Sequence, residues 1–198
     1  MHQKLNTIRR HVLDDTWELI KAKNVVEPLI SSPSLGWMKA NAQQAALFLR
    51  MQLSRQVILI LTRLTALPNS GRTGEIASIL AVLNEASSAN IITQTAMQTY
   101  LDELSEMKQN ISKQGTAFED LVTFRNSELA HSLHNVKAVP NGLSYFVISQ
   151  FADDTIKLVN SIEAHLVRCG CSAIVANISE FDGHWSKYGS EFWEALTV

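Results

Sequence analysis

The feature that most constrains the fold is the spacing of apolar residues, which recur every three or four positions through most of the chain. This spacing gathers them on one side of an α-helix, whereas a half-buried strand needs apolar and polar residues in alternation. The 198 residues include only 8 glycines and 4 prolines, the residues that most often interrupt helices. The sequence therefore predicts an all-α protein, an antiparallel helical bundle of four to five main helices with a short C-terminal helical or aromatic extension.

Short segments rich in Ser, Pro, Asn and Gly separate the predicted helices. We expect helices over residues 3 to 29, 35 to 67, 75 to 86, 90 to 131 with a kink or break at Gly115, and 144 to 169. Residues 134 to 142 predict a turn. The bundle thus takes residues 1 to 169. Residues 170 to 198 look less regular and hold several aromatic side chains, among them Trp185, Tyr188, Phe192 and Trp193, so we expect an extension that packs on the bundle or on a dimer interface.

Composition narrows the class of protein. A chain of 22.0 kDa with 46% hydrophobic residues suits one folded domain. Its longest aliphatic run, residues 57 to 61, is far shorter than a membrane span, and the N-terminal residues lack the apolar core of a signal peptide. We therefore expect a cytoplasmic protein with no membrane partner. The only cysteines, Cys169 and Cys171, are too few for a disulfide framework or a structural zinc site, and their role stays open.

Charge is distributed unevenly, although the net charge is only −2. Residues 28 to 74 contain no Asp or Glu, whereas residues 75 to 128 contain eight acidic residues. Two interpretations stay open: oppositely charged helices that pack together, or a basic groove that follows an RNA backbone. The candidate RNA-binding residues are Lys39, Arg50, Arg55, Arg63 and Arg72.

Residues 124 to 132 carry the pattern Phe-Arg-Asn-x(3)-Ala-His-Ser, late in a predicted helix. A guanidinium such as that of Arg125 binds phosphate, and a histidine such as His131 can exchange a proton near neutral pH. The stretch resembles the Arg-polar-x(4)-His signature of the HEPN superfamily and is most similar to its AbiU2-like branch. Residues 61 to 64, followed by a loop and an apolar helix, are similar to a helix pair of that branch.

The resemblance implies a metal-independent endoribonuclease without a cofactor, acting in a toxin-antitoxin or phage-defence setting. In this chemistry the RNA's own 2′-hydroxyl attacks the adjacent phosphate and leaves a 2′,3′-cyclic phosphate. Arg125 would stabilise charge on the phosphate oxygens, His131 would act as general base or general acid, and Asn126 would orient the histidine or the backbone. The implied partners are RNA and a second copy of the chain, with an antitoxin protein as a possible third.

Helix geometry limits how Arg125 and His131 can cooperate. Six positions on an ideal helix separate them by roughly 120° around the axis and about 9 Å along it, so they do not share a face. A common site requires Arg125 to reach across, the helix to unwind near Ala130, or a second subunit to help. The resemblance implies the third, since HEPN domains commonly dimerise so that two motifs line one cleft.

Other interpretations of the same residues remain. The alternative function is a non-catalytic helical module that dimerises and binds RNA or a protein through the same cleft. Arg125 could simply pair with Glu128 one turn along, and His131 could be a helix-end cation favoured by the dipole. Glu128 and His131 also have the Glu-x-x-His spacing of di-iron bundles, but the sequence has no second copy. His131 and His134 could form half of a metal site, for which no third ligand is evident.

Overall fold

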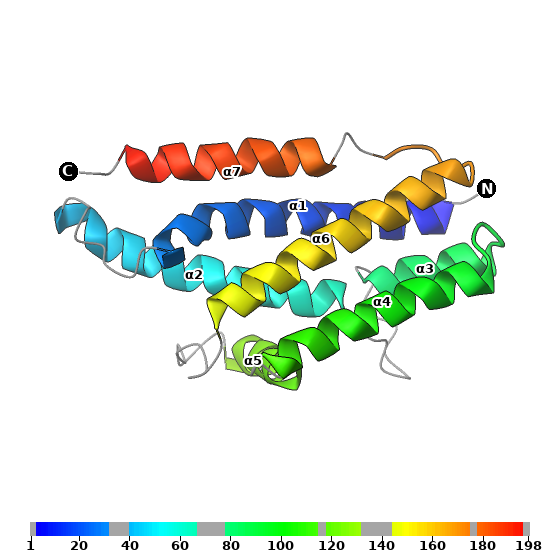
Figure 1. The fold of residues 1–198 in the computed structure, drawn as a ribbon, viewed down its shortest axis with the longest axis horizontal. Coiled ribbons are helices and arrows are strands. Elements are labelled where there is room, and N and C mark those ends of the chain that lie inside the picture. Colours follow the sequence, from blue (N-terminus) through cyan, green and yellow to red (C-terminus); the bar gives the residue numbers. More distant parts are fainter. Residues whose placement is uncertain are drawn as a thin grey trace.

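The computed structural model describes residues 3–31, 40–66, 78–114, 118–131, 144–174 and 178–195, with the side chains of residues 31, 40, 41 and 127–131 left out. These ranges contain seven α-helices and no strand (Figure 1), which confirms the prediction of an all-α bundle. The helices are α1 (Gln3–Ser31), α2 (Ala40–Leu64), α3 (Ile79–Ser88), α4 (Gln94–Lys113), α5 (Phe118–His131), α6 (Tyr145–Arg168) and α7 (Ile178–Glu194).

Helix α1 is central to the fold and packs against α2, α3, α6 and α7. In Figure 1, α7 covers α1 from one side, while α4 and α5 lie on the opposite side of the molecule, beyond α2 and α6. Helices α2 and α6 both run antiparallel to α1 (Figure 1). Arg9 and Lys23 of α1 pair with Glu163 and Asp153 of α6, in reverse order along the chain. Asp15 of α1 pairs with Arg63, near the end of α2. Apolar side chains from α1 to α6, joined by Ile178 at the start of α7, form the main core.

Local sequence signals account for several helix ends. The side-chain oxygens of Ser78 and Thr93 accept hydrogen bonds from the first turns of α3 and α4, so both residues act as N-caps. Asn90, with a φ of 55°, lies in the left-handed region between these two helices. Gly170, with a φ of 92°, follows the last turn of α6. The predicted helix over residues 90 to 131 is two helices, and its expected break lies between Lys113 and Phe118.

The C-terminal segment is more regular than its sequence suggests, because α7 is a helix of 17 residues that runs parallel to α1. The indole N–H of Trp193 donates to the Val25 carbonyl oxygen at 2.6 Å, and Phe181 stacks on Trp17 with ring centroids 5.0 Å apart. A Cβ at Gly189 would lie 2.3 Å from the Asn24 carbonyl oxygen. The two backbones therefore approach as closely as they do only because residue 189 is glycine.

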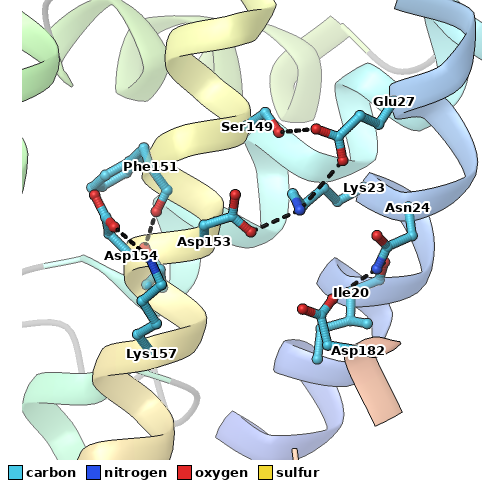
Figure 2. A network of polar contacts seen from close by, with 11 residues as sticks. Ile20, Lys23, Asn24, Glu27, Ser149, Phe151, Asp153, Asp154, Lys157 and Asp182 are labelled. Carbon is cyan, nitrogen blue, oxygen red and sulfur yellow. Dashed lines mark hydrogen bonds and ion pairs between the residues drawn. The ribbon is translucent and has the colours of Figure 1, made fainter. Parts of the chain in front are cut away.

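Polar groups tie α1 to α6 inside the bundle. Arg9 is fully buried, and its guanidinium forms two hydrogen bonds with Glu163, at 3.0 and 2.8 Å, and one each with Asn6 and the Ser172 carbonyl. Figure 2 shows a second connection, in which the Lys23 ammonium lies 2.7 Å from Asp153. Such buried charges are tolerated only when they are paired and hydrogen-bonded.

Neighbouring acidic groups stabilise the protonated form of Lys23. Burial by itself lowers its pKa, but the hydrogen bond to Asp153 and the charges of Asp153 and Glu27 outweigh this effect and raise the pKa above the ordinary value of 10.5. Glu27 also accepts a hydrogen bond from Ser149 at 3.3 Å (Figure 2). Lys23 thus stays protonated at neutral pH and connects α1 with α6.

Helix α2 has one property that bears on membranes. Its residues Ala42–Leu64 are long and apolar enough, by length and composition alone, to cross a bilayer. However, 44% of the apolar window is buried inside the bundle, and core helices of many proteins pass the same test. Length and hydropathy therefore do not separate a core helix from a membrane span here.

Candidate functional site

Helix α5 carries the Arg125 to His131 motif and packs against α2 and α4. Its core face is set by Leu121 and Phe124, which are 0% and 3% exposed. Arg125 follows Phe124 and is half-buried, while Asn126 is exposed. The packing of α5 thus places the guanidinium at the edge of the core, where its charged end can meet both protein and solvent.

Within the described part of the chain, the guanidinium of Arg125 donates to its neighbour Asn126 and to the end of α2. Its Nε and Nη2 donate to the side-chain oxygen of Asn126, at 3.4 and 3.3 Å. Its Nη1 donates to the Thr62 carbonyl oxygen, in the last turn of α2, at 3.5 Å. The Asn126 contact thus involves Arg125, whereas the resemblance assigned Asn126 to orienting the histidine or the backbone.

A second cation converges on the same end of α2. The Lys108 ammonium, from α4, donates to the Thr65 carbonyl oxygen at 2.6 Å and lies 4.4 Å from the centre of the Phe118 ring. Burial lowers its pKa, opposed by the charge of Glu119. Cations are favoured at helix C-termini, where carbonyl groups lack partners within the helix. Lys108 was not among the site residues predicted from the sequence, because only the packing of α4 on α2 brings it there.

The backbone of α5 remains helical through Ala130 to His131. The helix therefore does not unwind near Ala130, which removes one of the three routes to a common site. The side chains of Glu128 and His131 lie outside the described part of the chain, as does His134. The predicted Arg125 to Glu128 pair and the imidazole position stay predictions.

The predicted basic stripe is not a single exposed surface over the described residues. Arg55 is buried, with 6% exposure, so it adds little to a surface that an RNA strand could contact, and its binding of RNA stays a prediction. Arg63 is half-exposed and pairs with Asp15 through two hydrogen bonds. Arg50 is half-buried and lies roughly 140° around α2 from either of the others. Lys39 and Arg72 lie outside the described residues.

One cation of the acid-free stretch, Arg63, forms an ion pair with Asp15. This acid lies on α1, so charge complementarity operates between α2 and α1. Burial raises the pKa of Asp15, against the lowering effects of the hydrogen bond and the charge of Arg63. Arg63 thus takes part in helix packing, but its partner lies on α1 and not in the acid-rich residues 75 to 128, so the expected packing of those two segments stays a prediction.

Two clefts flank the C-terminal half of α4, and Lys113 lines both. The first, of about 200 Å³, lies between α4 and α6. Its apolar lining consists of Met107, Ile111, Val147 and Phe151, and its polar lining consists of Asn110, Lys113, Gln114, Gln150 and Asp154. The second, of about 380 Å³, lies between α4 and the start of α5 and includes Lys108, Phe118 and Glu119.

Metal ligands and cysteine thiols are two further kinds of reactive group to consider in the described residues. There, no group of three or more His, Cys, Asp or Glu side chains is placed to hold a metal ion. Cys169 is exposed and Cys171 is half-buried, and both are free thiols. Burial raises the pKa of Cys171, which disfavours its reactive thiolate.

Comparisons of the chain with protein-family models, with curated proteins and with solved structures find no match. The specific part of the resemblance to HEPN domains is the motif at residues 124 to 132, and the function must be argued from the residues and their geometry.

Proposed function

We propose that this chain is a metal-independent endoribonuclease of the HEPN type, working as a homodimer in a toxin-antitoxin or phage-defence setting. The observation that carries the proposal is the contact between Arg125 and Asn126, in which one carboxamide oxygen accepts from both Nε and Nη2. A guanidinium held by its neighbour loses less freedom when it binds a phosphate. Asn126, the polar residue that follows the arginine in the motif, would then hold the guanidinium in position for a phosphate.

In the proposed reaction the 2′-oxygen of RNA bonds to the adjacent phosphorus while the bond from phosphorus to the 5′-oxygen breaks. A base removes the proton from the 2′-hydroxyl, and an acid protonates the departing 5′-oxygen. One histidine cannot fill both roles at the same moment. A homodimer supplies two copies of His131, one for each role, and Arg125 would stabilise the negative charge that builds on the phosphate.

The helical backbone of α5 supports this division of work between subunits. Because α5 continues to His131, Arg125 and His131 leave the helix in directions roughly 120° apart. A phosphate bound by Arg125 would then meet an imidazole from the second copy more easily than one from its own helix. An RNA substrate and a dimer partner are therefore required together.

The test is RNA cleavage by the purified chain in excess EDTA. We expect cleavage that leaves 2′,3′-cyclic phosphate ends, and we expect DNA of the same sequence to survive. Arg125→Ala and His131→Ala should each lower the cleavage rate by about 100-fold or more. Asp120→Asn, a change of an exposed side chain in the first turn of the same helix, is the matched control and should leave the rate unchanged. Dependence on an added metal, or full activity in both variants, would refute the mechanism.

A second candidate is a non-catalytic module that dimerises and binds RNA or a protein. The observation that favours it is the contact between Arg125 and the Thr62 carbonyl, since this guanidinium also stabilises the end of α2. Expression in cells separates the two functions. The wild type, expressed without an antitoxin, should arrest growth and His131→Ala should not if the chain is a nuclease, whereas equal growth would favour the binding module.

A further inference from the structure

The cleft between α4 and α6 has an apolar floor and a polar rim. Its apolar part includes Met107 and Phe151, and its rim carries three carboxamides, one carboxylate and one ammonium group. Its volume of about 200 Å³ is below the roughly 300–1,000 Å³ of sites for drug-sized ligands. These dimensions suit one planar ring system with several polar groups on its edge.

We propose that this cleft binds the guanine base of an RNA strand, an inference that rests on the proposed ribonuclease function and names its substrate preference. Single-stranded RNA is recognised by contact with the faces of its bases and by hydrogen bonds to their edges. Met107 and Phe151 are only 7% and 1% exposed, so they close the floor of the cleft, and the exposed polar rim is the part that can meet the edge of a base.

The polar rim selects guanine through the Asp154 carboxylate, which only accepts hydrogen bonds. Guanine presents two adjacent donors, its N1–H and its 2-amino group, to such an acceptor. Adenine and cytosine place a ring nitrogen acceptor beside their amino group, and uracil flanks its one N–H with two carbonyls, so each would face the carboxylate with a lone pair. Asn110 accepts from the Lys113 ammonium at 3.4 Å, which leaves its amide N–H groups to donate to the guanine O6.

The present partner of Asp154 does not block this role. Its carboxylate lies 3.4 Å from the Lys157 ammonium, and the two side chains are 41% and 75% exposed. Exposed ion pairs of this kind contribute little stability, so the carboxylate can exchange Lys157 for a ligand. Gln150, which also lines the cleft, is exposed on the same helix.

The cleft lies close enough to the motif for one RNA strand to occupy both. Phe151 of the cleft packs edge-on against Phe118, the first residue of α5, with ring centroids 6.0 Å apart. Arg125 follows seven residues later, two helical turns or about 10 Å along α5. Lys113, which lines the cleft between α4 and α5 as well, provides a positive charge for the backbone of the strand.

The experiment measures binding of GMP, AMP, CMP and UMP to the full chain by calorimetry or by NMR titration. We expect GMP to bind about ten-fold more tightly than the other three nucleotides, and Asp154→Asn to remove that advantage. Asp102→Asn, at an exposed acid on α4 outside the cleft, is the control and should retain it. Gln150→Ala should weaken GMP binding, and circular dichroism should show every variant folded.

Equal affinities for the four nucleotides, or an unchanged preference for GMP in folded Asp154→Asn, would overturn the guanine site. Neither result requires RNA cleavage, so the site and the nuclease can fail separately. Selective GMP binding by a chain that leaves RNA intact would retain the base site and refute the nuclease. Cleavage with no preference for guanine near the cut would refute the base site alone.

Discussion

Replacement of Gly189 by alanine should be more harmful than any other glycine-to-alanine change within α7. The added Cβ would lie 2.3 Å from the Asn24 carbonyl oxygen and 2.9 Å from its carbonyl carbon, both backbone atoms of α1. A rotamer change cannot relieve contacts with backbone atoms, so α7 would have to move away by about 1 Å to reach an ordinary contact distance. The same movement would stretch the hydrogen bond from Trp193 to Val25.

Opposing effects set the size of the change. Alanine favours the helical state over glycine by about 1 kcal/mol, whereas forcing extra volume into a packed contact costs about 1–3 kcal/mol. Loss of the Trp193 hydrogen bond adds about 1 kcal/mol. We therefore expect Gly189→Ala to lower the free energy of unfolding by about 1–3 kcal/mol.

Gly183 offers a matched control in the same helix. A Cβ there would have no atom within 4 Å, so Gly183→Ala should raise the free energy of unfolding by about 0.5–1 kcal/mol through helix propensity. Urea unfolding, followed by circular dichroism and tryptophan fluorescence, measures both variants. Hydrogen exchange of the α7 amides shows whether this helix separates first. Equal stability of the two variants would refute the close contact between α7 and α1.

The remaining predictions concern buried and exposed charges. Arg9→Met should lower the free energy of unfolding by about 3–5 kcal/mol, because it leaves Glu163 unpaired in the bundle. Lys4→Met removes an exposed pair with Glu85 and should cost less than about 1 kcal/mol in the same urea titration. Lys23 has a raised pKa, so its contribution is complete below pH 10.5 and is lost as the pH rises through the higher pKa of the folded state. Stability measured against pH should therefore fall less steeply above pH 10.5 in Lys23→Met than in the wild type, and identical slopes would contradict the pairing with Asp153.

The regular parts of the bundle could be predicted because helical periodicity is a local property. Helix α6, Tyr145–Arg168, lies within one residue of the predicted range at each end, since its apolar residues recur at helical spacing and Gly170 follows it. The break near Gly115 could be predicted because glycine disfavours the interior of a helix, which is also a local property. Helix α7 was harder, because its glycines resembled signs of an irregular segment, whereas Gly189 is required by contact with α1.

The candidate site divides in the same way. Arg125 and Asn126 are adjacent in sequence, so their pairing needed only a local motif to suggest it. Nothing local connects Arg125 with Thr62, or Lys108 with Thr65, because those contacts cross between helices. The burial of Arg55 could not be predicted either, because the absence of acidic residues from a stretch does not show which of its cations faces the core.

The sequence by itself determined that the chain is helical and that Arg125, Asn126 and His131 lie on one helix, because a period of 3.6 residues can be recognised without knowing what each helix touches. Only the tertiary structure decided that α7 packs on α1, that two cations meet at the end of α2, and that a polar cleft opens between α4 and α6. Such contacts join residues far apart in the chain, and which helices pack together depends on the shapes of whole faces rather than on any short motif.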